Sequence, residues 1–92
     1  MMKVKDGSNY YYLVNGLFYD KLESSNRKIN KRIWELLNHE IFLIWYNPEH
    51  KIISLEPTTQ FDRIPNYVWN YFHSQKCLKW LESKFKEVSH EV

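Results

Sequence analysis

The chain contains no alanine, only two glycines and a single cysteine, and its longest apolar run is the six residues from Ile41 to Tyr46. A single cysteine excludes an internal disulfide framework and a cage of thiolate metal ligands. A run of six residues is far too short to span a bilayer, which takes about 20. Gly7 and Gly16 lack the spacing of a glycine-rich phosphate loop. The sequence therefore predicts no membrane span, disulfide scaffold or nucleotide-binding loop.

The overall composition predicts one small cytoplasmic domain. Residues 1–92 are enough to bury roughly two thirds of the unfolded surface around a single core. No apolar signal segment follows Met1, which favours the cytoplasm. Frequent Lys, Asn, Ile and Tyr without Ala are typical of AT-rich genomes. We therefore expect the cytoplasm of a low-GC bacterium or of an infected host cell.

The residues that most often carry catalysis or bind metals are scattered along the chain. His39, His50, His73 and His90 do not stand at helical ligand spacing from one another. A metal site needs three or four convergent donors. Cys77 lies on the apolar side of a predicted helix, where a free cysteine behaves as a small hydrophobic residue. We predict no catalytic residue, no metal and no cofactor, and hence a protein that is not an enzyme.

Asn15-Gly16 is the strongest local signal for a turn. A two-residue type I′ turn needs positive φ at both central positions, and Asn-Gly accepts this conformation best. The segments 10–14 and 17–22 on either side are rich in Tyr, Leu and Phe. The sequence therefore predicts a first β-hairpin here.

The remaining elements follow from apolar spacing and from turn residues. They are a helix at about 26–38, strands at 41–46 and 52–56 joined by the turn 47–50, a helix at 65–72, and a last helix at about 75–88 that Ser74 can cap. The resulting order is ββαββαα. We expect an α+β fold with a four-stranded antiparallel sheet, made of two hairpins, packed against helices.

A basic face on the first predicted helix is the first candidate binding surface. Ile29, Ile33, Leu36 and Leu37 fall in one arc of the helix, and the opposite arc carries Arg27, Lys28, Lys31 and Arg32 with Trp34 at its border. Such a face tracks phosphates or binds an acidic protein, with the indole stacking on a base or filling a pocket. The alternative is an ordinary solvated helix face. On the last helix Trp80 stands beside Lys76 and Lys84, where a cation–π contact would explain the pattern without any ligand.

Aromatic residues on the sheet are the second candidate surface, because the chain has four Trp, seven Tyr and five Phe. In the first predicted hairpin Tyr10, Tyr12 and Tyr19 share a face. The second hairpin places Phe42, Ile44, Tyr46, Ile53 and Leu55 on one side and Ile41, Leu43, Trp45, Ile52 and Ser54 on the other. Helices that cover only one side would leave an exposed apolar patch, which soluble monomers seldom show without a partner. The alternative is that the helices cover both sides.

These surfaces predict a small non-enzymatic binding module that regulates or inhibits a partner macromolecule by occupying its surface. A phage or mobile-element accessory protein, acting against a host defence or a nucleic-acid enzyme, is one such module. The alternative is binding of RNA or single-stranded DNA by aromatic stacking and a basic helix, and a structural subunit or homodimer is the third interpretation. The predicted partner-binding residues are Arg27, Lys28, Lys31, Arg32, Trp34, Tyr10, Tyr12, Tyr19 and Trp45.

Overall fold

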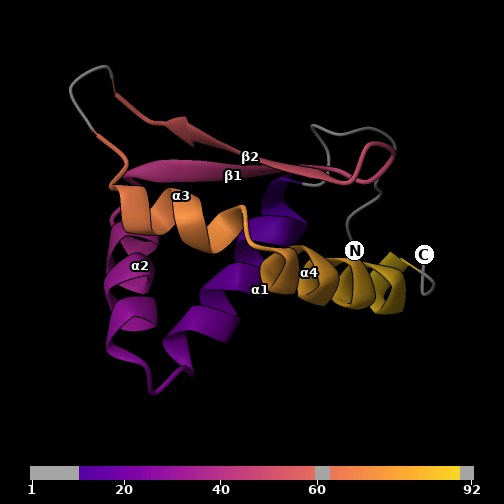
Figure 1. The fold of residues 1–92 in the computed structure, drawn as a ribbon, viewed down its shortest axis with the longest axis horizontal. Coiled ribbons are helices and arrows are strands. Elements are labelled where there is room, and N and C mark those ends of the chain that lie inside the picture. The colour runs from indigo at the N-terminus through magenta and orange to yellow at the C-terminus, as the bar shows by residue number, and fades with distance from the viewer. Residues whose placement is uncertain (1–10, 60–62, 90–92) are drawn as a thin grey trace.

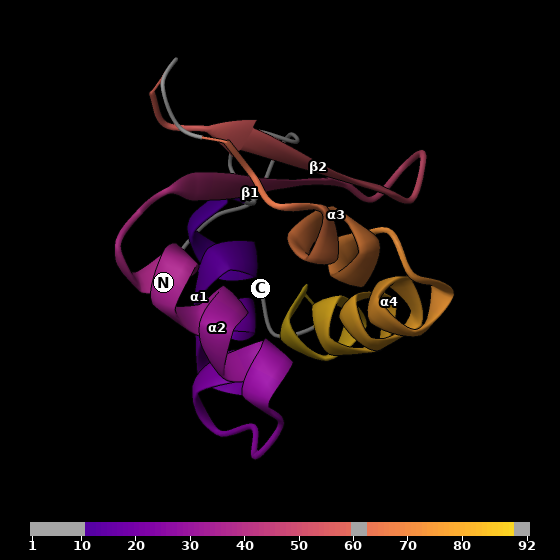
Figure 2. The ribbon, with the colours of Figure 1, turned by 60° about the vertical axis from the view of Figure 1, so that its left-hand side comes forward.

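The computed structural model describes residues 11–59 and 63–89 as four helices and one two-stranded antiparallel sheet. The element order is α1 (Tyr11–Glu23), α2 (Lys28–Asn38), β1 (Phe42–Asn47), β2 (Ile52–Pro57), α3 (Asn66–Phe72) and α4 (Gln75–Ser89). The hairpin lies across one side of the molecule, with α1 and α2 beneath one part of it and α3 and α4 beneath the other (Figures 1 and 2). The fold is α+β, but the predicted ββαββαα order with a four-stranded sheet is wrong.

The error lies in the first predicted hairpin, because residues 11–23 form helix α1 instead. Val14, Phe18 and Leu22 recur every four residues and are fully buried. Burying each of these side chains contributes about 1.5–3 kcal/mol, whereas a glycine inside a helix costs only about 1 kcal/mol. Gly16 is exposed and does not adopt a positive φ. Burial of the apolar stripe therefore outweighs the local turn preference of Asn15-Gly16.

The Asn15 side chain connects helix α1 to the sheet. Its Nδ2 donates to the carbonyl oxygen of Ile44 at 2.8 Å, and its Oδ1 accepts from the backbone N–H of Ile44 at 3.2 Å. Ile44 therefore directs its backbone polar groups away from β2, toward the helix. A single side-chain amide satisfies the two groups that a third strand would otherwise pair with.

The second predicted hairpin is confirmed. β1 and β2 pair antiparallel, with Ile44 opposite Leu55 and Tyr46 opposite Ile53. One of the two predicted sides is the buried inner side, namely Phe42, Ile44, Tyr46, Ile53 and Leu55. The outer side is more open, and Ile52 is 54% exposed there. The four-residue turn and the period of two along each strand thus predicted correctly which residues share a face.

The predicted helices at 26–38, 65–72 and 75–88 correspond to α2, α3 and α4 with small shifts at their ends. Ser74 caps α4 as predicted, because its Oγ accepts from the backbone N–H of Cys77 at 3.1 Å. Helix α2 ends with two backbone bonds, from Glu40 to Leu37 and from Ile41 to Leu36. Glu40 has a φ of 57° there, in a position that usually holds glycine.

The core lies between the inner face of the hairpin and the four helices. Phe18 is at its centre, with ring centroids 4.9 Å from Phe72 and 5.0 Å from Trp80. Phe72 also packs edge-on against Phe42 of β1 at 5.7 Å. These rings join α1, α3, α4 and the sheet into one body. Within the described ranges, no helix is long and apolar enough to cross a membrane.

Two neighbouring substitutions in α1 are expected to change stability in opposite directions. Asn15→Ala removes both partners of Ile44 and should lower the free energy of unfolding by about 2 kcal/mol. Gly16→Ala should raise it by about 0.5–1 kcal/mol, because a Cβ at this position meets nothing within 4 Å and the backbone is helical. Urea denaturation measures both. A destabilising Gly16→Ala change would indicate a turn with positive φ and contradict the helix.

Candidate functional site

A cleft of about 630 Å³ lies among the helices, within the range of about 300–1,000 Å³ typical of small-molecule sites. It separates α1, α2 and their connection from α3 and α4, which lie on opposite sides in Figure 2. We call it the basic cleft. Its lining consists of Lys21, Ser25, Arg27, Ile29, Asn30, Tyr67, Asn70, Tyr71, Ser74, Lys76, Cys77 and Trp80.

The connection between α1 and α2 builds one wall of the basic cleft. The hydroxyl oxygen of Ser25 accepts from the backbone N–H of Arg27 at 3.2 Å and from Nδ2 of Asn30 at 2.9 Å. The Asn30 side chain is buried, and this bond fixes its amide. Arg27, the N-cap residue of α2, is thereby held at the rim with its own side chain exposed.

Helix α4 builds the opposite wall, with Lys76, Cys77 and Trp80 facing the cleft. Lys21 reaches across from α1 and places its Nζ 5.0 Å from the centre of the Trp80 ring. The predicted cation–π contact of Trp80 is therefore present, but Lys21 makes it in place of Lys76 or Lys84. This contact joins the two walls.

The basic cleft has a positive character. Lys21, Arg27 and Lys76 line it, and its described lining contains no carboxylate. None of the three forms an ion pair with a described residue. A recessed surface that carries charge of one sign focuses the field and attracts counter-charged ligands. The cleft is therefore suited to an anion.

The floor of the basic cleft contains a hydroxyl group without a partner. The Tyr71 hydroxyl oxygen is buried and makes no hydrogen bond within the described chain. Burial raises the pKa of Tyr71, the neighbouring Cys77 raises it further, and the Arg27 charge opposes the rise. Unpaired buried polar groups are uncommon in folded proteins and are often found at functional sites. The Tyr71 hydroxyl is thus a buried group within reach of the Arg27 charge.

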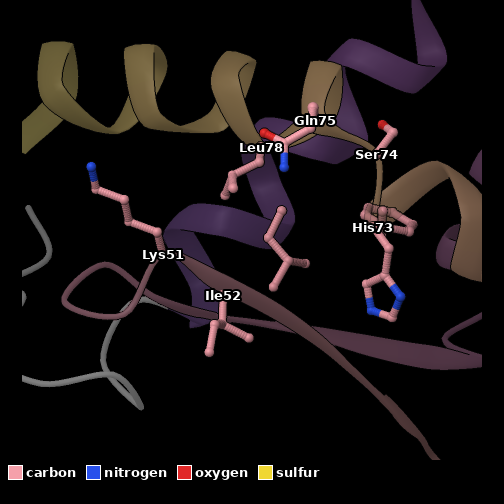
Figure 3. A pocket seen from close by; sticks show the side chains of 8 residues that line it. Lys51, Ile52, His73, Ser74, Gln75 and Leu78 are labelled. Carbon is pink, nitrogen blue, oxygen red and sulfur yellow. The ribbon is translucent and has the colours of Figure 1, made fainter.

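Two smaller hollows are less suited to an anion. One of about 220 Å³ lies between the start of β2 and the junction of α3 and α4 (Figure 3), where Lys51 is paired with Glu82 at 3.7 Å. Another of about 270 Å³ lies along the seam between α1 and β1 and includes the carboxylate of Glu40. Only the basic cleft combines several cations with a lining free of described carboxylates.

The predicted basic face is partly assembled in the structure. Arg27 lines the basic cleft, whereas Lys28, Lys31 and Arg32 are exposed on the outer side of α2. We call these three residues the outer basic face. Trp34 is half-buried and packs against Tyr19, with 5.5 Å between the ring centres. Its ring therefore covers the α1–α2 contact.

The described members of the predicted aromatic platform do not share one sheet face, because Tyr12 and Tyr19 lie on α1 and Trp45 lies on β1. Tyr12 is 74% exposed on α1, and Tyr19 donates from its hydroxyl to Asn38 Oδ1 at 3.3 Å. Both line the hollow of about 270 Å³ between α1 and β1. Trp45 lies on the outer face of the hairpin, where its Nε1 donates to Glu56 at 2.7 Å. Tyr10 lies outside the described residues.

Several residues of the cleft lining were not predicted from the sequence as binding residues. They are Lys21, Tyr67, Tyr71, Lys76 and Trp80. The pairing of Trp80 with basic residues was a usable signal, although it had been given a purely structural interpretation. Lys21 gave no such signal, because it was placed at the end of a strand. Its position on α1 follows only from the helical fold of residues 11–23.

Within the described ranges, no group of three or more His, Cys, Asp or Glu side chains is placed to hold a metal ion. Comparison of the chain with protein-family models, with curated proteins and with solved structures finds no match. The function is therefore inferred from the chemistry of the chain itself.

Stability should fall at alkaline pH because of Cys77. Burial raises the pKa of this thiol from its ordinary 9.0 to about 12, with the Lys21 charge opposing the rise. The unfolded chain loses the proton near pH 9, and the folded chain keeps it until near pH 12. The contribution of this group is therefore constant below about pH 9 and lost as the pH rises toward 12. Urea unfolding from about pH 7 to about pH 11 should show a shallower decline for Cys77→Ala than for the wild type; equal slopes would contradict it.

Proposed function

We propose that this protein is a non-enzymatic module that binds single-stranded RNA or DNA through the basic cleft. The observation that carries this proposal is the gathering of Lys21, Arg27 and Lys76 around aromatic side chains, without a carboxylate in the described lining. Cations that contact phosphates and rings that stack on bases are the two components of single-strand recognition.

The shape of the site supports a single strand over a duplex. Tyr67, Tyr71 and Trp80 are only partly exposed along the walls and floor of the cleft, so a ligand has to enter it to contact their rings. Bases of a duplex are stacked on one another, whereas unpaired bases are free to stack on protein side chains. The outer basic face of α2 begins directly after Arg27 and offers three further cations for the strand that leaves the cleft.

The chemistry of the remaining groups supports binding over catalysis. Cys77 is buried, and its raised pKa keeps the thiol protonated at neutral pH. A protonated and buried thiol is a poor nucleophile. The charged groups of the cleft are cations, which are suited to contacting anions.

A protein partner is the second candidate, and the outer face of the hairpin is the observation that favours it. Leu43 and Trp45 are half-buried there, and Ile52 is exposed. The sequence-based expectation of a regulator or inhibitor combined the basic first helix with a four-stranded sheet that has one uncovered face. The sheet has two strands in the described chain, so this apolar surface is smaller than the sequence suggested.

Charge reversal on α4 tests the proposal with a matched pair of variants. Lys76→Glu places a carboxylate in the cleft, whereas Lys79→Glu makes the same change at an exposed position outside the cleft lining. Fluorescence anisotropy with labelled single strands of about 12 nucleotides, RNA and DNA in separate titrations, measures the affinity. Lys76→Glu should weaken binding roughly tenfold. It should also reduce the slope of the logarithm of the binding constant against the logarithm of the salt concentration by about 0.7, the value for one lost phosphate contact.

Lys79→Glu should leave the affinity within about twofold of the wild type, since it changes net charge equally but lies outside the site. Both variants should unfold at the same urea concentration as the wild type, because exposed charges contribute little to stability. Equal loss in both variants would indicate nonspecific attraction. Absence of binding to either strand at low salt would overturn the proposal and leave the outer face of the hairpin as the better candidate.

A further inference from the structure

The basic cleft changes in character from its rim to its floor. Arg27 and Lys76 are exposed, Tyr67 and Trp80 are half-buried, and Asn30 is buried. Two of the three cations therefore lie on the outside, and the rings of Tyr67 and Trp80 and the amide of Asn30 lie further in. A simple inorganic anion would use only the rim, whereas a ligand with an anionic end and a planar, hydrogen-bonding end would use the whole depth.

We propose that the basic cleft is a pocket for one nucleotide, with the phosphate between Arg27 and Lys76 and the base against Trp80. This inference deepens the proposed function and rests on it in placing the strand at this cleft. The cleft volume of about 630 Å³ is that of a site for one small molecule and not for a run of nucleotides. The rest of a bound strand then continues over the outer basic face.

The contact between Lys21 and Trp80 marks the place where the base stacks. The Lys21 ammonium lies 5.0 Å from the centre of the Trp80 ring and occupies a place beside the indole. Stacking of a base on an aromatic ring is stronger than a partly solvated cation–π contact, so the base displaces the ammonium. Lys21 is then free to contact the phosphate, and the positive charge stays in the site.

Amide groups of the cleft supply contacts for the edge of the base. Asn70 is exposed at the lining, and the Asn30 amide is oriented by its bond to Ser25 at 2.9 Å. Amide side chains both donate and accept hydrogen bonds, as base edges do. An acidic peptide would use the cations but would leave the aromatic wall without a planar partner. These contacts favour a nucleotide over such a peptide.

Binding of 5′-AMP alone tests the inference. Calorimetry measures its affinity for the full chain, with adenosine and inorganic phosphate as the two half-ligands and a short polyglutamate peptide as a further anion. A proton–nitrogen NMR spectrum shows where the ligand binds, because each of the four tryptophans gives one indole N–H signal. The signal of Trp80 is assigned by its loss in Trp80→Phe. We expect saturable binding of 5′-AMP, a shifted Trp80 signal, and affinities at least tenfold weaker for adenosine and for phosphate. Lys76→Glu should weaken 5′-AMP at least fivefold and Lys79→Glu less than twofold.

Competition with a labelled strand separates this inference from the proposed function. If 5′-AMP displaces the strand, both are supported. If the strand binds in a Lys76-dependent way but 5′-AMP neither binds nor competes, the nucleotide pocket is overturned and single-strand binding stands. If 5′-AMP binds but no strand does, the pocket stands and single-strand binding is overturned. Equal affinities for 5′-AMP, phosphate and polyglutamate would reduce the cleft to a nonspecific anion site and overturn the inference.

Discussion

The two hydrogen bonds between the Asn15 side chain and the Ile44 backbone hold the molecule together at the point where helix and sheet meet. An isolated two-stranded hairpin is marginally stable in water, so β1 and β2 depend on the helices for their stability. Asn15 also fixes the position of α1 along β1. Six residues further on, the same helix carries Lys21, which contacts Trp80 of α4. The helix that Asn15 joins to β1 thus also contributes a cation to the basic cleft.

The part of the fold that could be predicted from sequence is the part with an unambiguous apolar pattern. Residues 41–46 form a continuous apolar run that turn residues join to 52–56, and α2 and α4 each have a single apolar stripe. Residues 11–23 have neither pattern, because Tyr12, Leu13, Leu17 and Tyr19 place aromatic or apolar groups around the whole helix. Asn15-Gly16 then gave the only strong local signal, and it pointed to a turn. Tertiary burial of Val14, Phe18 and Leu22 decided the outcome.

The site was less predictable than the fold, because its residues come from four helices and from the connection between α1 and α2. Arg27 was identified from the charge density of its helix. Lys21 of α1 and Tyr71 of α3 line the same cleft only because the two helices pack close together in the fold. A sequence pattern reports neighbours along one helix or strand. It does not report which side chains of separate elements face one another across a gap.

The pairing of Asn15 with Ile44 also bears on how copies of this chain can associate. Growth of a fibril by strand addition requires two open edges on every sheet, one to receive a strand and one to offer the next site. In this hairpin the β1 edge is closed at Ile44 by a side chain from the same molecule. At Ile44, therefore, the side chain that joins α1 to the sheet also occupies the backbone groups with which a strand of another molecule would pair.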